Sequence, residues 1–397
     1  MAKEPAIRSL TIQNLLSFGP EPTTVELRNL NVLIGPNGSG KSNLIEVLGL
    51  LHSAPDELTK AITRGGPIDE WLWKGGAKTR TTPTASICVV MNPIPGRKAE
   101  LVYRLEFTRA AGYRFEITDE RVENRLPLGK PSSHVYYQRP NGSSKPNGRP
   151  GASTHRRASL DPRVSVLRLR NDPESQPATA HVGDVFSQLR LYSDWQFGAL
   201  SPVREPCDAS LQNQYLEEDF SNLGVVLDRL LAVPSVKDRI LTSLQTFCED
   251  TKDLRTNIEG GRVQIRLFEK HLKAGVPLVR MSDGTLRWLT LLAILLNPDP
   301  PPLVCIEEPE LGLHPDMIHE LAELLIEAST RMQLIITTHS DRLVEEFSDT
   351  PEAVVVCEKE SGVSQFRRLD AGKLSTWLEE YTLGQLWTKG QIGGTRW

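Results

Sequence analysis

Residues 35–42, with the sequence GPNGSGKS, constrain this 397-residue chain more than any other feature. They match the pattern G-x-x-x-x-G-K-[ST], with an apolar run before them at residues 30–34 and a helical pattern after them at residues 42–51. Glycines allow a tight turn whose backbone N–H groups point at phosphate oxygens, and the helix start adds the positive end of its dipole. Lys41 would reach the β- and γ-phosphates, and Ser42 would offer its hydroxyl to Mg²⁺. The expected nucleotide-binding residues are Gly35, Asn37, Gly38, Ser39, Gly40, Lys41, Ser42 and Asn43.

An acidic cluster, EEPE at residues 307–310, directly follows the buried-strand pattern of residues 303–306. Ligands bind at this end of the strands in parallel α/β sheets. Adjacent strand residues point to opposite sides, so two neighbouring glutamates need different roles unless the strand has ended. We assign Glu307 to the Mg²⁺ shell and Glu308 to orienting and deprotonating the attacking water. The phosphate loop alone leaves ATP or GTP, and hydrolysis or sensing, open; together with this pair it predicts a nucleotide hydrolase.

Composition excludes several other classes of protein. The net charge of −4 excludes a globally basic nucleic-acid binder, although a local basic groove remains open. The five cysteines are scattered without a CxxC pair, which argues against a disulfide framework and structural zinc. No apolar run approaches the ~18 residues of a membrane span, and the N-terminus lacks an apolar signal core. We therefore expect a cytoplasmic protein with no membrane association.

Three further segments carry a family resemblance. MSDGTLR at residues 281–287 precedes an apolar helix, LGLHP at residues 311–315 follows the acidic cluster, and IITTHS at residues 335–340 ends the next strand. In order and spacing, these segments, the phosphate loop and EEPE resemble the RecF/SMC/OLD-like branch of ABC ATPases. Within that branch the chain resembles the compact predicted-ATPase group. The resemblance covers about residues 6–50 and 260–397.

The resemblance implies ATP as the nucleotide, Mg²⁺ as its metal, and sites shared between two subunits of a homodimer or higher oligomer. Ser282 and Gly284 would begin a helix facing the γ-phosphate bound by the other subunit, as the helix dipole favours. His339 would hydrogen-bond the γ-phosphate in its own subunit. A Q-loop glutamine cannot be placed, because the strand expected to end at residues 197–200 is followed by SPVR. Gln138, Gln188 and Gln196 remain unanchored alternatives.

The expected fold class is α/β: a P-loop NTPase head of ABC type, with a mixed or parallel sheet flanked by helices, an antiparallel β lobe and a helical insertion. Residues 1–135 would form the N-terminal ATPase lobe, with a β meander at residues 86–91, 101–108 and 113–122. Residues 136–170 read as a flexible basic loop, and residues 171–260 as a mostly helical insertion. Residues 261–397 would form the C-terminal ATPase lobe. The resemblance makes residues 281–287 its signature segment, residues 311–315 its D-loop and His339 its switch histidine, with the acidic strand end at residues 303–310.

The lengths of the remaining segments limit what else the chain can carry. The stretch between Lys41 and Glu307 is too short for SMC-type coiled-coil arms, and the stretch after His339 is too short for an OLD-type toprim domain. An effector such as a nuclease would therefore be a separately encoded chain. Basic residues at 145–170 read either as a solvated loop or as a non-specific contact to DNA phosphates. A second basic cluster runs from Arg262 to Arg287.

Two functions remain in competition. The first is an ATP-hydrolysing motor or sensor subunit of a bacterial DNA-linked system, of the anti-phage defence kind, with a separate effector. The second is a RecF-like repair ATPase that binds DNA as an ATP-dependent dimer. The EEPE and SDGT forms argue against a transporter subunit, and the complete catalytic set argues against a non-hydrolysing sensor. The tryptophan-rich residues 370–397 are either packed on the core or kept for a partner.

Overall fold

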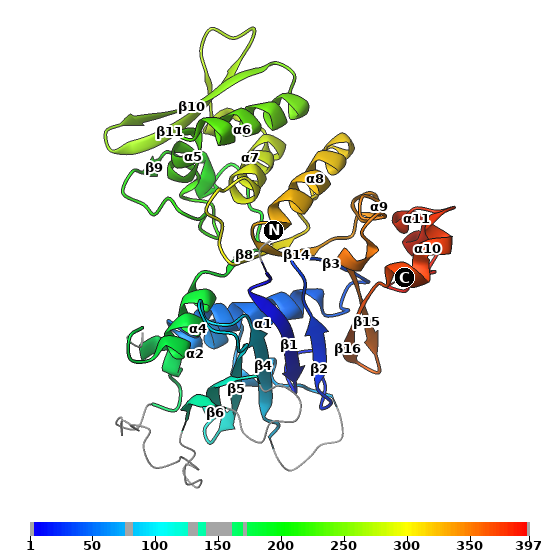
Figure 1. Ribbon diagram of the computed structural model, residues 1–397. Helices are drawn as coiled ribbons and strands as arrows, with labels where there is room; N and C mark the ends of the chain where they lie inside the picture. Colours follow the sequence, from blue (N-terminus) through cyan, green and yellow to red (C-terminus); the bar gives the residue numbers. More distant parts are fainter. Residues whose placement is uncertain (1–3, 76–81, 126–133, 140–160, 170–172, 395–397) are drawn as a thin grey trace.

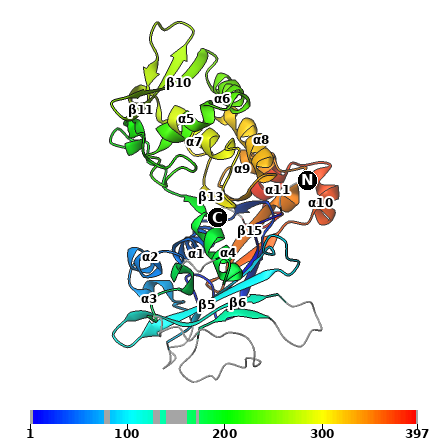
Figure 2. The same cartoon turned by 60° about the vertical axis from the view of Figure 1, so that its left-hand side comes forward.

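The computed structural model describes residues 4–75, 82–125, 134–139, 161–169 and 173–394. Figure 1 shows a lower body built on a large antiparallel sheet, an upper body of helices with a small sheet, and a parallel sheet between them. Figure 2 shows the same two bodies from the side, with β13 of the parallel sheet at their junction. None of the helices within the described ranges is long and apolar enough to cross a membrane.

The central sheet has the strand order β16-β15-β3-β14-β13-β8, antiparallel in its first pair and parallel elsewhere. Every side chain of β3 and β14 is buried, as expected for strands covered on both faces. The predicted parallel sheet flanked by helices is confirmed. The strands are β3 (Leu30–Ile34), β8 (Arg190–Tyr192), β13 (Leu303–Glu307), β14 (Gln333–Thr337), β15 (Val354–Glu360) and β16 (Val363–Arg368).

The lower body contains the predicted antiparallel meander, with the strand order β2-β1-β4-β5-β6-β7. Burial alternates along β4, so one face packs inward and the other is more exposed. The strands are β1 (Ile7–Gln13), β2 (Thr23–Glu26), β4 (Ala85–Met91), β5 (Leu101–Ala110), β6 (Arg114–Asn124) and β7 (Val135–Gln138). The helices are α1 (Lys41–Ser53), α2 (Leu58–Arg64), α3 (Ile68–Trp71) and α4 (Pro177–Ser187).

The upper body corrects part of the expected helical insertion. Residues 188–222 form two short strands and a short 3-10 helix (Pro202–Arg204) joined by turns and loops, and residues 251–259 form a strand that pairs with β11. Within residues 171–260 the predicted helix is found in α4, α5 and α6, whereas glycine and proline interrupt the segment between α4 and α5. The elements here are β9 (Cys207–Asp208), α5 (Leu223–Leu231), α6 (Pro234–Phe247), β10 (Thr251–Glu259), β11 (Arg262–Glu269), β12 (Val276–Pro277), α7 (Asp283–Leu295) and α8 (Ile318–Ser329).

The strand expected to end at residues 197–200 is also wrong. The strand in this part of the chain is β8, which ends at Tyr192, and residues 198–200 form a bend and a turn. Trp195 and Phe197 give the segment its strand-like appearance, but both rings pack on Phe220, at centroid distances of 5.3 and 5.5 Å. They therefore anchor a loop between the central sheet and the upper body.

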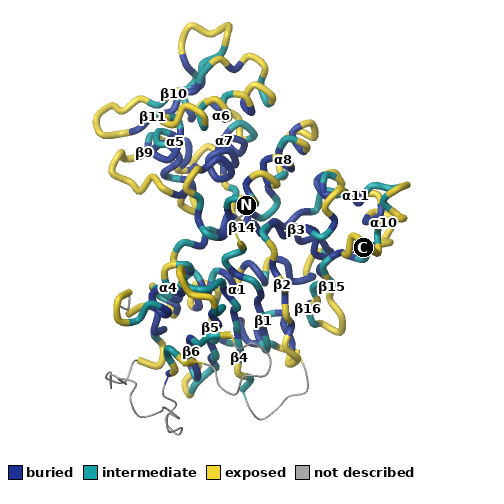
Figure 3. Tube along the Cα trace, in the orientation of Figure 1, coloured by how far each residue is buried: buried dark blue, intermediate teal, exposed yellow. Residues whose placement is uncertain are grey.

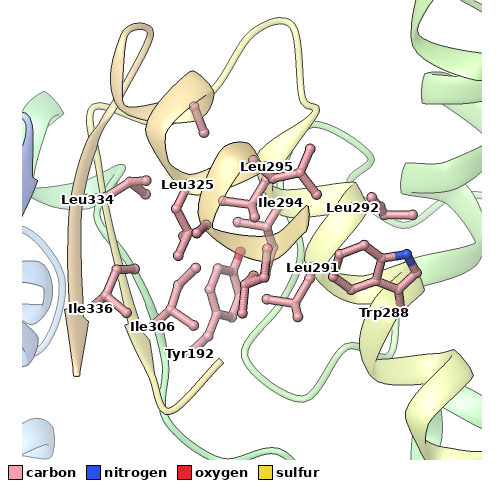
Figure 4. Close-up of a cluster of buried hydrophobic side chains, with 14 of the residues drawn as sticks. Tyr192, Trp288, Leu291, Leu292, Ile294, Leu295, Ile306, Leu325, Leu334 and Ile336 are labelled. Carbon is pink, nitrogen blue, oxygen red and sulfur yellow. The ribbon is translucent and has the colours of Figure 1, made fainter. Parts of the chain in front are cut away.

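Two hydrophobic cores lie on opposite faces of the central sheet. Along β13, Val304 and Ile306 join the upper core, whereas Leu303 and Cys305 join the lower one. Figure 4 shows the upper core, where Ile306, Leu334 and Ile336 meet leucines of α7 and α8. Figure 3 shows that buried residues, in dark blue, are frequent along the strands and helices in the middle of the molecule. Alternate side chains of the sheet thus belong to different cores.

The C-terminal segment contains α9 (Asp341–Glu345), α10 (Ala371–Leu378) and α11 (Leu383–Thr388). Trp387 is buried, and its indole N–H donates to the carbonyl of Gly394 at 2.6 Å. The Gly394 N–H donates to the Glu358 carboxylate at 2.8 Å, and a Cβ on Gly394 would lie 3.4 Å from the Gly35 Cα. This geometry supports the packed alternative, with the tail lying against the start of the phosphate loop.

We expect Trp387→Ala to lower the free energy of unfolding by about 3–5 kcal/mol, because it removes a large buried side chain. Trp377→Ala is the matched control, since that ring is 49% exposed, and it should change stability by about 0.5 kcal/mol or less. Urea unfolding of both variants measures the difference. Equal losses would contradict the packed tail.

Candidate active site

The phosphate loop joins β3 to α1, as its sequence predicts. Gly40 has a φ of 107°, and a Cβ there would lie 2.1 Å from the Ser364 hydroxyl. A Cβ on Gly35 would lie 2.1 Å from the Cys357 carbonyl. Only glycine fits either position, so β15 and β16 fix the path of the loop from behind.

A chain of hydroxyl and amide groups braces this loop. The Asn43 amide donates to the Ser17 hydroxyl at 2.7 Å, and Ser17 lies 2.7 Å from the Ser364 hydroxyl. The Ser364 hydroxyl is also 2.7 Å from the Ser39 carbonyl. Each hydroxyl carries one proton, so the chain is consistent when Ser17 donates to Ser364 and Ser364 donates to Ser39. Asn43 thus has a bracing contact, whereas Asn37 and Gly38 are exposed at the tip of the loop.

Lys41 is the first residue of α1 and is buried. Its ammonium group donates to the carbonyls of Gly35 and Pro36 at 2.7 and 3.1 Å. Burial lowers the pKa of Lys41, and the nearby carboxylates of Glu308 and Glu307 act in the opposite direction. The lysine therefore lies between the phosphate loop and the acidic strand end, where a polyphosphate would offset its desolvation.

Glu307 is the last residue of β13 and is the candidate metal ligand together with Ser42. The Ser42 hydroxyl hydrogen-bonds the Glu307 carboxylate. Burial raises the pKa of Glu307, and the charge of Glu308 adds to this effect, whereas Ser42 and Lys41 oppose it. A hydroxyl and a partly desolvated carboxylate form an oxygen donor set that suits Mg²⁺. The Glu307 carbonyl accepts the indole N–H of Trp195 at 2.7 Å, which ties the strand end to the loop after β8.

Glu308 follows the strand end with a φ of 47°, in the left-handed region that non-glycine residues rarely adopt. Its N–H donates to the Thr337 carbonyl at 2.9 Å, so β14 holds this conformation. The turn answers the question of alternation, because Glu308 is no longer part of the strand. Its carboxylate lies 3.8 Å from the His339 imidazole, and the structure thereby brings together two residues predicted to flank the γ-phosphate.

The signature segment begins a helix, as expected. Ser282 is the N-cap of α7, and its hydroxyl accepts the Thr285 N–H. A Cβ on Gly284 would lie 3.5 Å from the carbonyl of Gly312 in the LGLHP segment. The signature segment and the D-loop are therefore adjacent within the chain. Ser282 is exposed, so this helix start is accessible from outside the chain.

Sequence reasoning missed the buried arginine that shapes this turn. Arg204 donates to the carbonyls of Phe197 and Met281 at 2.8 Å each, and it also pairs with the Asp283 carboxylate. It therefore joins the loop after β8 to the signature segment. No sequence motif predicts this role, because Arg204 contacts backbone carbonyls and residues distant in the chain.

The position of Gln196 in the chain is that expected of a Q-loop glutamine, but its side-chain contact is not. Strand β8 pairs in parallel with β13, so the loop after Tyr192 leaves the sheet beside the acidic strand end. Gln196 is in this loop, and its amide donates to Asp194 at 2.6 Å. Gln138 ends β7 and Gln188 follows α4, which places both on other elements. Gln196 is the one of the three whose position suits a Q-loop.

The basic clusters fall in different places. Most of the basic segment at residues 145–170 lies outside the described residues; of its members within them, Arg163 pairs with Asp161 and Arg168 with Glu57. The basic residues of the second cluster do not form a single surface patch. Arg262 and Arg266 lie on β11, whereas Arg287 lies inside the body beside the acidic strand end.

Comparison with known proteins agrees with this geometry. The family described as "AAA domain, putative AbiEii toxin, Type IV TA system" matches residues 30–345. The chromosome partition protein Smc of Mycolicibacterium paratuberculosis is 27% identical over 116 residues. This match spans 28% of the present chain and 9% of that protein, so it concerns a small part of the relative's length.

Solved structures extend the likeness to nearly the whole fold. An SMC head bound to the C-terminal winged-helix domain of ScpA aligns with a TM-score of 0.60 at 15% identity, covering 94% of this chain and 100% of that chain. An SMC head with an extended coiled coil from Pyrococcus furiosus, bound to the C-terminal domain of ScpA, gives 0.56 at 13% identity, covering 95% and 99%. The chain belongs to the AAA-domain family named above, and it is an ATP hydrolase with the fold of an SMC-type ABC ATPase head.

Proposed function

We propose that this ATP hydrolysis takes place with Mg²⁺ at the edge of the central sheet, through the residues that converge there. The observation that carries this assignment is the approach of His339 to Glu308 beside the Lys41 and Ser42–Glu307 contacts. Glu308 acts as the base that orients and deprotonates the attacking water. His339 hydrogen-bonds the γ-phosphate, and Ser42 and Glu307 hold the metal.

The chain's own groups account for the main requirements of phosphoryl transfer. The backbone N–H groups of the phosphate loop and the start of α1 bind the phosphates, and Lys41 exchanges its carbonyl partners for phosphate oxygens. When bound, Mg²⁺ would neutralise part of the negative charge of the phosphates. The left-handed turn at Glu308 directs its carboxylate toward His339, so base and phosphate ligand face the same point.

The proposed active form is a homodimer or higher oligomer in which each ATP lies between two subunits. Ser282 and Gly284 of one subunit would present the start of α7 to the phosphates bound by the other. Two large apolar side chains beside this surface are strongly exposed: Val279 at 55% and Leu311 at 57%. Such residues favour an interface next to the signature segment and the D-loop.

We place this ATPase in a bacterial DNA-linked system, of the anti-phage defence kind, with a separately encoded effector such as a nuclease. The family description names a putative toxin and a toxin–antitoxin system. It therefore supports a role in defence rather than a role in chromosome partition. The SMC heads bound to ScpA domains show that a head of this fold can dock a separate protein. The alternative is a RecF-like repair ATPase that contacts DNA as an ATP-dependent dimer.

Expression with and without neighbouring genes tests this placement. If the protein acts in defence, the set of genes should reduce phage plaque formation, and Lys41→Ala should remove the protection. Sensitivity to DNA damage in the deletion strain, with unchanged plaque counts, would instead support the repair alternative.

We expect Lys41→Ala to abolish ATP binding, and Glu308→Gln to keep binding while turnover falls by ~10²–10⁴-fold, the usual range for a positioned base. Equilibrium binding of a fluorescent ATP analogue and steady-state phosphate release separate the two effects. Lys60→Ala, an exposed substitution on α2, is the control and should match the wild type. Wild-type turnover in Glu308→Gln would remove the base assignment.

Mixing two inactive variants tests the shared site. Lys41→Ala chains still offer an intact signature, and Ser282→Arg chains still bind ATP, so a mixed dimer keeps one complete site and should recover part of the activity. A mixture of Lys41→Ala and Glu308→Gln is the matched control, because both defects affect the same side of the site and no complete site forms. A fully active monomer in sedimentation would exclude the shared-site arrangement.

A further inference from the structure

Glu310 has contacts that its place in the EEPE segment does not explain. One carboxylate oxygen accepts two hydrogen bonds, from the Thr338 hydroxyl at 2.5 Å and from the backbone N–H of His339 at 3.3 Å. The other oxygen is buried and has no hydrogen-bond partner among the described residues. Burial raises the pKa of this carboxyl, which the same two hydrogen bonds oppose. Glu310 is thus a costly group at the base of the switch-histidine loop.

Thr338, the partner of Glu310, is itself fixed on the sheet. It is fully buried, and its N–H donates to the Leu33 carbonyl at 3.1 Å, next to the phosphate loop. Its hydroxyl donates to Glu310 and accepts the N–H of Ser340 at 3.0 Å, so the hydroxyl's position is determined from both sides. His339 lies between Thr338 and Ser340 in the chain. Its backbone therefore has little conformational freedom while Glu310 accepts its N–H.

Arg287 holds the other side of the same turn. From the second turn of α7 it donates to the Glu308 carbonyl at 3.2 Å, and its guanidinium lies over the Trp195 ring at 4.7 Å. Burial lowers the pKa of Arg287 to about 10, and the charges of Glu310 and Glu308 oppose this shift. Glu308 is therefore held through its carbonyl by α7 and through its N–H by β14.

We propose that Glu310 is a positioning residue for ATP hydrolysis, whose carboxylate fixes the His339 loop against Glu308. This inference rests on the proposed roles of Glu308 and His339, and it adds a residue to which no reaction role has been assigned. A displacement of about 1 Å at a reacting group can reduce the rate by about 10²-fold, so a hydrogen bond that fixes the histidine backbone has a measurable share in turnover.

The buried carboxylate is poorly explained by stability alone. A buried polar group with an unpaired oxygen costs free energy, and an apolar side chain of similar size is often neutral or stabilising at such a position. Glu310→Met should therefore fold while losing both hydrogen bonds to residues 338 and 339. Glu310→Gln keeps a side chain of the same length with one acceptor oxygen, and it serves as the conservative variant.

The experiment measures turnover and ATP affinity for Glu310→Met, Glu310→Gln, His339→Ala and the double variant Glu310→Met/His339→Ala. We expect Glu310→Met to lower kcat by about 10-fold or more, up to the ~10²-fold of a misplaced group, with ATP affinity unchanged within about twofold. Glu310→Gln should restore most of the loss. The double variant should be no slower than His339→Ala, because Glu310 acts through the histidine. Glu323→Ala, an exposed glutamate on α8, is the control.

The outcomes separate this inference from the proposed function. The positioning role would be overturned if the kcat losses of the two single variants multiplied in the double variant, or if Glu310→Met kept the wild-type kcat. Either result would leave the His339 assignment intact. An unaffected His339→Ala would remove the histidine's proposed role and this inference with it. A thermal midpoint that falls equally in Glu310→Met and Glu310→Gln, with kcat falling in parallel, would show a purely structural role.

Discussion

The site depends on the parallel register of β3, β14 and β13. Leu33 pairs with Thr337, and Thr337 pairs with Glu307, so the three strands end at one edge of the sheet. The phosphate loop, the acidic turn and the switch-histidine loop must therefore meet there, whatever their separation along the chain. The hydrogen bond from the Glu308 N–H to the Thr337 carbonyl extends this alignment one residue beyond the strand, so the strand pairing also fixes the position of Glu308, the proposed base.

The two cores make that edge rigid. Side chains of each central strand alternate between the cores, so a shift of one strand by a single residue would exchange buried contacts on both faces at once. Such a sheet cannot slide to accommodate a misplaced loop. Adjustment is left to the segments that attach at the edge, and two arginines bind those segments together: Arg204 joins the loop after β8 to the signature segment, and Arg287 joins α7 to the acidic turn.

The sequence was informative where the chemistry is local. The phosphate loop, the strand end at Glu307 and the cap at Ser282 are each encoded within a few residues, and the structure places all of them as elements of the expected kind. It was misleading at residues 197–200, because aromatic residues that anchor a loop on Phe220 look like those of a strand. The hydroxyl brace of Ser17 and Ser364, and the contacts of Arg204 and Glu310, depend on the strand register and on loop paths. No spacing rule in the sequence could reveal them. The left-handed turn at Glu308 likewise has no signal, since neither glycine nor asparagine occupies it.

The charged residues at this edge of the sheet are destabilised by burial, and this destabilisation has a consequence for ligand binding. Burial raises the pKa of Glu307 and lowers that of Lys41, so each charge is less stable here than in water. Their mutual attraction offsets only part of this cost. A metal ion against Glu307 and a polyphosphate against Lys41 would offset much more, because charges interact more strongly in a poorly solvated site. The desolvation that destabilises these charges in the protein alone would thus favour the binding of a metal–nucleotide complex. A fold optimised only for stability would not place these groups here, and the phosphate loop, the acidic turn and Glu310 are the places where this chain departs from that optimum.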